Sequence, residues 1–165
     1  MAGKASKDKG KAFEREVADY LTQTYNDNFM RVPSSGAYTG GTNAFRKKIM
    51  TTGQVRSFKG DIIPPDDWNS FHCEAKFYKD FSFNLVFMNE YALLDSWINE
   101  VRAAEEPNDL NLILMKFNYK GRWVLFENKH GFDVTNKLDY KEWYFCSWDN
   151  FWTPTNTALV KHLSV

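Results

Sequence analysis

Three ionic side chains occur in two short apolar segments, where folding alone favours apolar residues. Asp61 lies near the start of GDII (60–63), and Glu74 and Lys76 lie in FHCEAKF (71–77). Side chains in a β-strand alternate between its two faces, so we expect Glu74 and Lys76 to project side by side from one face, together with His72. The other face is predicted to belong to the core and carries Phe71, Cys73, Ala75 and Phe77.

The chemistry of this pattern depends on where Asp61 lies relative to Glu74. The segment PPDDWNS (64–70) between them is typical of a turn, so the two strands are predicted to form a hairpin, in which the two carboxylates converge if the register allows it. Asp66 and Asp67 are interpreted as plain turn residues. Neighbouring carboxylates repel each other unless a cation lies between them, and oxygen ligands of this kind suit Mg²⁺ or Mn²⁺. We therefore predict a divalent metal site at Asp61 and Glu74.

A further acid is expected from a helix between residues 7 and 25. Its apolar residues recur every three or four positions, as in an amphipathic helix, and are Phe13, Val17, Tyr20, Leu21 and Tyr25. Glu14 falls inside this apolar sector, whereas Arg15 points away from it. Because burial of a lone carboxylate is costly, Glu14 needs a cation, a hydrogen-bond donor or a metal-bound water. Glu14 is therefore the helical acid that we place in the site, and Glu16, predicted to be solvated, is the second choice.

The remaining segments predict an α/β fold. Residues 29–33 are expected to form a short strand, residues 88–106 a second helix, and residues 110–118 and 121–128 a strand pair. The order helix, strand, hairpin, helix, strand pair predicts a mixed β-sheet flanked by helices. The chain after residue 128 has no clear assignment. Its aromatic cluster is interpreted as core rather than as a base-stacking platform, and comprises Trp143, Tyr144, Phe145, Trp148, Phe151 and Trp152.

Length and composition limit the class of protein. The 165 residues, 43% of them hydrophobic, are enough for one compact domain and leave little room for a second. No apolar run approaches the roughly 20 residues that cross a bilayer, and the polar start lacks the apolar centre of a signal peptide. Cys73 and Cys146 form no CxxC pair or histidine-spaced cluster, so neither a disulfide framework nor a zinc site is indicated. We expect a single domain over residues 1–165, cytoplasmic, without a membrane partner, and with residues 1–7 as a disordered tail.

The net charge of zero conceals an uneven distribution of charge. Residues 1–60 hold 11 Lys and Arg against 5 Asp and Glu, so that 10 of the 21 cations and 16 of the 21 anions remain for the rest of the chain. Residues 28–60 contain no acid and six cations, namely Arg31, Arg46, Lys47, Lys48, Arg56 and Lys59. Such a run is either a solvated loop or a nucleic-acid-binding segment. Residues 37–59 are accordingly predicted to form a long basic loop.

The ordered set of motifs resembles the PD-(D/E)xK nucleases and, among them, the archaeal-type Holliday-junction resolvases. The resemblance runs through GKAFEREVADYL (10–21), RVPSSG (31–36), GDII (60–63) and CEAK (73–76), and continues more weakly over residues 112–127. Two features depart from the family pattern. Residues 37–59 are longer than the usual link, and the hairpin contains two prolines and two extra acids. The longer link bears on the choice of substrate more than on the chemistry.

This resemblance implies a restriction-endonuclease-like core and metal-dependent hydrolysis of a DNA phosphodiester. Asp61, Glu74 and the backbone carbonyl of Ala75 would hold one or two Mg²⁺ ions, for which Mn²⁺ can substitute. Lys76 would orient the attacking water or neutralise charge in the transition state, and Glu14 would complete the metal shell. The positions expected to contact DNA are Arg15, Arg31, Ser34 and Ser35, with Arg46, Lys47, Lys48 and Arg56 adding salt-sensitive affinity.

Three functions remain open from the sequence. The first is a homodimeric endonuclease that resolves four-way junctions, because their two-fold character suits paired active sites. The second is a nuclease of the same chemistry that acts on flaps, ends or duplex DNA. The third is a DNA-binding protein that does not cut, although clustered carboxylates near phosphate argue against it. A small self-contained nuclease would also fit a phage genome and would then act inside the host cell.

Overall fold

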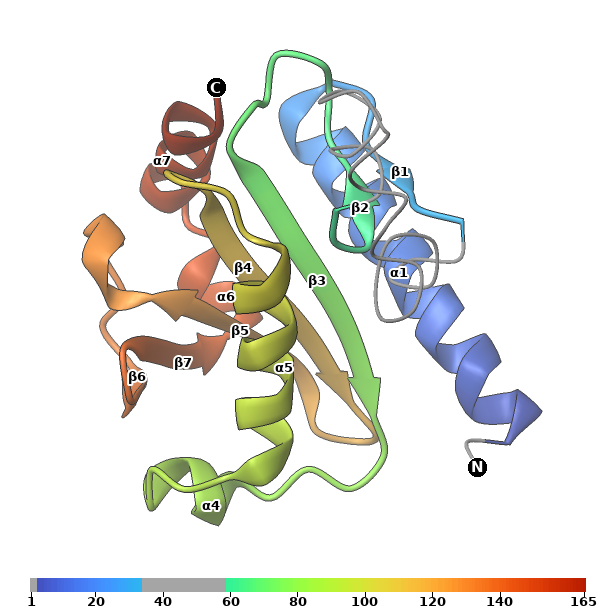
Figure 1. The fold of residues 1–165 in the computed structure, drawn as a ribbon, viewed down its shortest axis with the longest axis vertical. Coiled ribbons are helices and arrows are strands. Elements are labelled where there is room, and N and C mark those ends of the chain that lie inside the picture. The colour runs from blue at the N-terminus through green and yellow to red at the C-terminus, as the bar shows by residue number, and fades with distance from the viewer. Residues whose placement is uncertain (1–2, 34–58) are drawn as a thin grey trace.

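A computed structural model describes residues 3–33 and 59–165 of the chain (Figure 1). At the centre of this described part lies a five-stranded sheet with the strand order β3-β4-β5-β7-β6. Its strands are β3 (Phe71–Tyr78), β4 (Leu110–Phe117), β5 (Gly121–Glu127), β6 (Lys137–Tyr140) and β7 (Trp143–Ser147). Strands β3 and β4 are parallel and the other neighbours are antiparallel, so the predicted mixed sheet is confirmed.

Helices pack against both faces of this sheet (Figure 1). One face is covered by α1 (Lys4–Tyr25) and α7 (Pro154–Ser164), and the other by α5 (Ala92–Ala104), which connects β3 to β4. The alternation of β4 side chains divides the core accordingly, because Leu112 and Leu114 join the α1 cluster whereas Ile113 and Met115 join the α5 cluster. The shorter helices are α4 (Phe83–Phe87), α6 (Trp148–Phe151) and the 3₁₀ helix η2 (Asn128–His130).

The predicted hairpin between residues 60–65 and 70–78 is wrong in its pairing. Strand β2 (Ile62–Ile63) pairs antiparallel with β1 (Met30–Arg31), with Arg31 opposite Ile62. Pro64 and Pro65 have no N–H to donate, so a ladder cannot continue along this segment beyond Ile63. Strand β2 nevertheless lies beside β3, because the Asp61 N–H donates to the Cys73 carbonyl at 2.9 Å. The segment therefore brings Asp61 to the edge of β3, as predicted, by a different route.

The helix boundaries also differ from the predicted ones. Helix α1 begins at Lys4, so residues 4–7, which we expected in a disordered tail, are helical. The predicted helix over residues 88–106 is shorter at its start, because Asn89 has a left-handed φ of 59° and separates α4 from α5. Within the two described ranges, no helix is long and apolar enough to cross a membrane.

The chain after residue 128 contributes two strands and two α-helices to the fold. Its aromatic residues Trp143, Phe145, Trp148 and Phe151 are buried, and Tyr144 and Trp152 pack partly buried against the core. The interpretation of this cluster as core is therefore confirmed. Both cysteines, Cys73 and Cys146, are buried and unpaired, as expected for residues outside a disulfide framework.

Candidate active site

Asp61 is held against the edge of β3 by two backbone contacts. Its own N–H donates to the Cys73 carbonyl at 2.9 Å, and its Oδ2 accepts the Ala75 N–H at 2.8 Å. The preceding Gly60 makes this close approach possible: it has a φ of 71°, and a Cβ atom there would lie 2.5 Å from the Cys73 carbonyl oxygen. The carboxylate is consequently fixed, and Asp61 as a whole is only 6% exposed.

Glu74 and Lys76 project from β3 on the predicted face, next to Asp61. The Glu74 Oε2 lies 3.6 Å from the Lys76 Nζ, and its Oε1 lies 3.5 Å from the His72 Nε2. Lys76 also contacts the carboxylate of Glu100, which extends from α5. The structure thus brings Asp61, Glu74 and Lys76 together, while Cys73 and Ala75 face the core on the opposite side.

Glu74 and Lys76 are kept ionised by contacts with neighbouring side chains, because burial removes most of their contact with water. Burial opposes the ionisation of Glu74, but its contacts with His72, Lys76 and Asp61 outweigh burial and lower its pKa. Burial likewise opposes the charge on Lys76, yet the nearby Glu74, Asp61 and Glu100 raise its pKa. Glu74 is therefore anionic and Lys76 cationic at neutral pH, and the site combines fixed charges of both signs.

The carboxyl groups of Asp61 and Glu74 lie close enough to interact with each other. Two carboxyl groups in hydrogen-bonding contact must share either a proton or a cation. The Ala75 carbonyl points to the same side of β3 as the Ala75 N–H, and hence toward Asp61, as the alternation of a β-strand requires. No three His, Cys, Asp or Glu side chains gather as a metal site within residues 3–33 and 59–165. Of the predicted ligands, Asp61 and Glu74 contribute side chains and Ala75 contributes this carbonyl, whereas Glu14, expected to complete the metal shell, is paired with Arg31.

Glu14 has the cationic partner that its predicted inward position requires. Its Oε2 accepts a hydrogen bond from the Arg31 Nε at 2.5 Å, and the two side chains are only 14% and 20% exposed. Arg31 lies opposite Ile62, the residue after Asp61, so this ion pair borders the strand that carries Asp61. Arg31, expected to contact DNA, is thus also the partner of Glu14. Arg15 is exposed and points away from the core, as predicted.

Other predicted DNA-binding residues lie outside the described residues. They are Ser34, Ser35, Arg46, Lys47, Lys48 and Arg56. Lys59, the last cation of the basic run, is described, and it is buried rather than solvated. Its Nζ lies 2.5 Å from the Asp109 Oδ2, which also accepts the Glu106 N–H at 2.7 Å. This buried ion pair fixes the chain immediately before Gly60 and Asp61.

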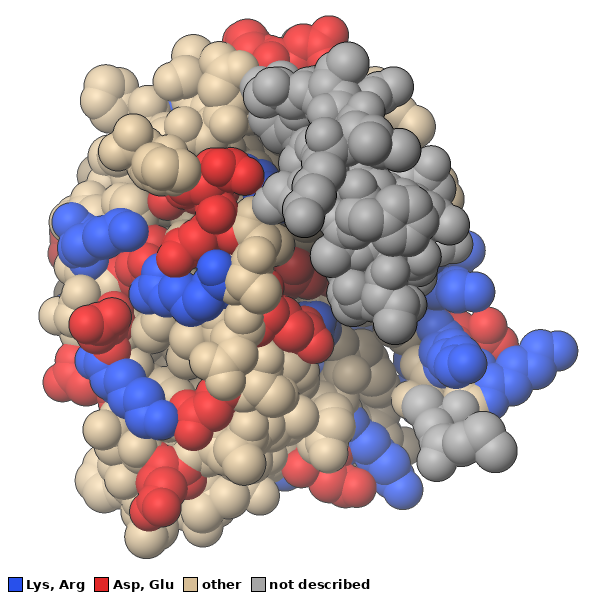
Figure 2. All heavy atoms as spheres, viewed as in Figure 1, with Lys and Arg blue, Asp and Glu red and all other residues tan. Residues whose placement is uncertain are grey.

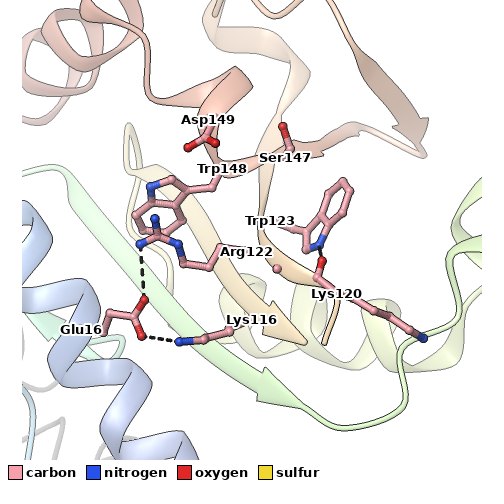
Figure 3. Close-up of a pocket in the computed structure, with 9 residues that line it drawn as sticks. Glu16, Lys116, Lys120, Arg122, Trp123, Ser147, Trp148 and Asp149 are labelled. Carbon is pink, nitrogen blue, oxygen red and sulfur yellow. Dashed lines mark hydrogen bonds and ion pairs between the residues drawn. The ribbon is translucent and has the colours of Figure 1, made fainter. Parts of the chain in front are cut away.

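Glu16 belongs to a separate hollow and is not simply solvated (Figure 3). Its two carboxylate oxygens lie 2.7 Å from the Lys116 Nζ and 3.4 Å from an Arg122 guanidinium nitrogen. Lys116 and Arg122 are directly opposite on β4 and β5, so a like-charged pair here needs an anion. Arg122 also stacks on Trp148, with its guanidinium carbon 4.3 Å from the ring centroid. The hollow has a volume of about 470 Å³, and its two cations balance the charge of Glu16 without a metal ion.

Cations gather elsewhere on the described surface, over the N-terminal half of α1. Figure 2 shows them on the right of the molecule, and the exposed members are Lys4, Lys7, Lys9, Lys11 and Arg15. The rest of the face seen in Figure 2 mixes acidic and basic residues. Part of the positive charge in the first third of the chain therefore lies on the exposed surface of a helix.

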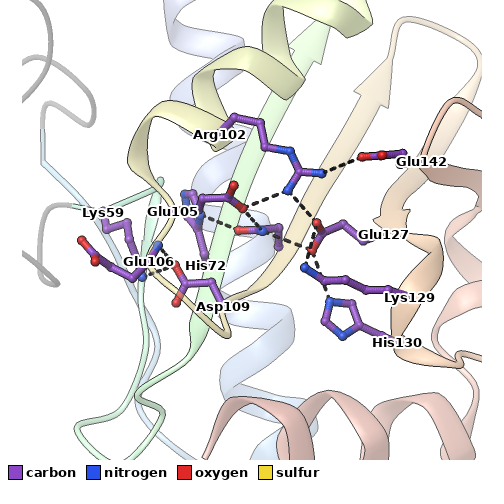
Figure 4. Close-up of polar contacts among 11 residues, drawn as sticks. Lys59, His72, Arg102, Glu105, Glu106, Asp109, Glu127, Lys129, His130 and Glu142 are labelled. Carbon is purple, nitrogen blue, oxygen red and sulfur yellow. Dashed lines mark hydrogen bonds and ion pairs between the residues drawn. The ribbon is translucent and has the colours of Figure 1, made fainter.

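A buried polar network lies behind β3 and was not predicted from the sequence (Figure 4). The His72 Nδ1 lies 2.8 Å from the Asn111 Oδ1, and the Asn111 amide donates to Glu105 at 2.8 Å and to Glu127 at 3.1 Å. Arg102 joins both of these carboxylates, at 2.9 and 2.6 Å. Asn111 is fully buried within LNLILMKF, a strand that is apolar apart from Asn111 and Lys116, and this polar residue was the signal available in the sequence.

The network predicts acid-sensitive stability through Glu127. Burial opposes its ionisation, but His130, Arg102 and Lys129 lower its pKa from 4.5 to about 2. A depressed pKa contributes stability that is complete above pH 4.5 and is lost as the pH falls toward 2. We expect up to about 3 kcal/mol of the free energy of unfolding to disappear across this window. Urea denaturation between pH 2 and 6 should show this loss in the native protein and a flatter profile in Glu127→Gln. An unchanged profile would exclude Glu127 as the source.

An acid clamped to the edge of a strand, with the E-x-K pattern on that strand in a helix-flanked mixed sheet, defines the PD-(D/E)xK class of nuclease. The model of the family described as "Phage putative PDDEXK endonuclease" matches residues 5–161, so the chain belongs to this family of phage endonucleases. Protein D14 of Escherichia phage T5 is 33% identical over 125 residues, which cover 73% of this chain and 69% of that protein. No solved structure is significantly similar to the chain.

Proposed function

We propose that this protein is a Mg²⁺-dependent endonuclease that resolves four-way DNA junctions as a homodimer, acting inside the infected host cell. Membership of a phage endonuclease family supports nuclease chemistry on DNA. The observation that carries the catalytic part is the meeting of Asp61 and Glu74 beside Lys76, with Asp61 fixed by the Ala75 N–H. The fixed geometry matters because catalysis at phosphate depends on positioned charge more than on covalent chemistry.

Asp61, Glu74 and the Ala75 carbonyl would hold the divalent ion. When bound, Mg²⁺ or Mn²⁺ would polarise the scissile phosphate and lower the pKa of an attacking water. Asp61 has one oxygen occupied by the Ala75 N–H, which sets the direction of the other. Glu74 is kept anionic by its neighbours and so is ready to act as a ligand without first losing a proton at neutral pH.

Lys76 would supply positive charge next to the reacting phosphate. Its side chain is 20% exposed and its ammonium group is held between Glu74 and Glu100, so it can reach a bound substrate without leaving its partners. Its raised pKa keeps it protonated, which favours charge stabilisation or water orientation over a role as general base. Glu14 would act through Arg31, orienting a guanidinium that can grip a phosphate oxygen beside Asp61.

The choice of substrate is tested by cleavage of branched and linear DNA side by side. With Mg²⁺, we expect cleavage of a synthetic four-way junction at least about 10-fold faster than of a linear duplex with the same arm sequences. Paired nicks should appear symmetrically, as two active sites related by two-fold symmetry would produce. Equal rates on both substrates would remove the junction preference and leave a nuclease for flaps, ends or duplex. No cleavage of any DNA with Mg²⁺ or Mn²⁺ would contradict nuclease activity.

The cations of the predicted basic loop should determine the salt dependence of DNA binding. Reversal of Arg46, Lys47 and Lys48 to Glu should weaken the affinity and reduce the slope of log K against log salt by up to about 3, since each phosphate contact contributes nearly one. Fluorescence anisotropy at several salt concentrations measures both quantities. Reversal of Lys79, Lys137 and Lys161, which are exposed and lie in other parts of the fold, provides a control with the same charge change. An unaltered slope in the loop variant would exclude these three residues from the DNA interface.

A further inference from the structure

We propose that His72 is a positioning residue of the metal site, oriented by Asn111 so that its Nε2 faces Glu74 and the ligands around the ion. This inference rests on the proposed metal-dependent function. His72 is 1% exposed and comes from the same face of β3 as Glu74 and Lys76. From the sequence, His72 is predicted only to share a face with these two residues. The contacts of its two ring nitrogens indicate its role.

The first ring nitrogen, Nδ1, has its proton fixed by Asn111. The Asn111 amide nitrogen is turned toward two carboxylates, those of Glu105 and Glu127, to which it donates. The Asn111 Oδ1 must therefore face His72, and it lies 2.8 Å from Nδ1. A carbonyl oxygen only accepts hydrogen bonds, so Nδ1 carries a proton. The contacts of Asn111 with Glu105 and Glu127 thus determine which nitrogen of the His72 ring carries the proton.

The second ring nitrogen, Nε2, points into the site and makes no well-formed hydrogen bond to any of the described residues. It is buried, and it has no hydrogen-bond partner in the part of the chain that the structure describes. Its nearest charged neighbour is the Glu74 Oε1 at 3.5 Å, too long for a well-formed hydrogen bond. A buried ring nitrogen left without a partner costs free energy comparable to a lost hydrogen bond. This geometry matches a nitrogen that gains a hydrogen-bond partner when the metal ion binds. The partner would be a ligand or a water molecule held at Glu74.

A role in folding alone does not account for this arrangement. Ile113 and Leu125 lie in the same hydrophobic cluster on this face, and apolar residues at 72 and 111 would extend that cluster without burying polar atoms. Buried polar networks are costly unless every member is satisfied, yet within residues 3–33 and 59–165 this one ends in a nitrogen whose contact is a carboxylate of the site at 3.5 Å. Substitution of residues that contact and orient metal ligands commonly lowers metal affinity by about 10- to 100-fold.

Two substitutions at His72 separate the roles of its ring nitrogens. The amide of Asn reaches only as far as Nδ1, so His72→Asn keeps a polar contact with Asn111 and removes the atom that faces Glu74. The amide of Gln reaches the position of Nε2, so His72→Gln retains a polar atom there. We expect Mn²⁺ binding to the full-length protein without DNA, measured by isothermal titration calorimetry, to weaken about 10-fold or more in His72→Asn. His72→Gln should stay within about 3-fold of the native protein.

The control is His162→Gln, at an exposed histidine of α7, which should bind Mn²⁺ as the native protein does. Thermal unfolding of each variant shows that the titrations are made on folded protein. If His72→Asn does not fold, Asn111→Ser carries the test, because it leaves His72 in place without its acceptor and should also weaken binding. Native affinity in His72→Asn, or in Asn111→Ser where that variant replaces it, overturns the proposal, as does equal weakening in His72→Asn and His72→Gln.

A further variant distinguishes failure of this inference from failure of the metal site. Asp61→Asn removes a proposed ligand and should abolish Mn²⁺ binding. If the native protein binds Mn²⁺, Asp61→Asn does not, and both His72 variants match the native protein, then only the role of His72 is wrong. If the native protein binds no Mn²⁺, or if Asp61→Asn binds it normally, the metal site itself is wrong and the role of His72 falls with it.

Discussion

Asp61→Asn and Glu74→Gln should each reduce Mg²⁺-dependent DNA cleavage by at least about 10³-fold, equivalent to roughly 4 kcal/mol of transition-state stabilisation. Both substitutions remove a negative charge and preserve the shape of the side chain. An Asn at position 61 can still accept the Ala75 N–H, so the contact that holds residue 61 to β3 should survive. The loss should therefore appear in the cleavage rate and not in the fold.

The measurement is single-turnover cleavage with enzyme in excess, accompanied by DNA binding in Ca²⁺ or without metal. DNA affinity should remain within about 3-fold of native in both variants, because neither residue is proposed to contribute binding charge. Lys76→Met should also lose cleavage, since it removes the cation beside Glu74. Glu100→Gln is the matched control: it alters an exposed partner of Lys76 and should change the rate less than about 5-fold. Native rates in Asp61→Asn or Glu74→Gln would remove the catalytic assignment.

Gly60→Ala should reduce cleavage by about 10²-fold although residue 60 carries no functional group. A Cβ at this position would lie 2.5 Å from the Cys73 carbonyl oxygen, which is backbone and cannot turn aside. The left-handed φ adds about 1–2 kcal/mol of strain for any residue with a side chain. The chain must then move away from β3 and take Asp61 with it, and a displacement of about 1 Å can cost 10² in rate.

Gly131→Ala provides the control for backbone strain. Gly131 has a similar φ of 76°, and a Cβ there would meet nothing within 4 Å. Both variants should therefore lose stability in urea denaturation, but only Gly60→Ala should lose cleavage. A Gly60→Ala protein that cuts at the native rate would show that the close approach of residue 60 to Cys73 does not position Asp61.

The local pattern of the sequence was sufficient to predict the chemistry of β3. Strand alternation has a period of two, so the types of residues 71–77 alone determined which side chains share a face with Glu74. The structure confirms that division, with Cys73 and Ala75 in the core. The helical position of Glu14 was predictable for the same reason, because a carboxylate inside an apolar sector requires a partner. The identity of that partner, Arg31, was not predictable from the helix.

The parts that escaped prediction depend on contacts between distant segments. Strand β2 pairs with β1 across an intervening segment of the chain, and no local signal distinguishes that pairing from a hairpin with β3. Lys59 was counted with the cations of the basic run because its partner Asp109 lies 50 residues further along the chain. The network behind His72 likewise draws on α5, β4 and β5, which meet only in the folded protein.

The central claim is that Asp61 and Glu74 hold one divalent ion between them. A crystal of the protein grown or soaked with Mn²⁺ tests it directly, through anomalous scattering at the manganese edge. The account predicts an anomalous peak within about 2.0–2.4 Å of oxygens from both carboxylates and from the Ala75 carbonyl, and its loss in Asp61→Asn. A peak bound elsewhere, or Mn²⁺ retained in Asp61→Asn, would contradict it.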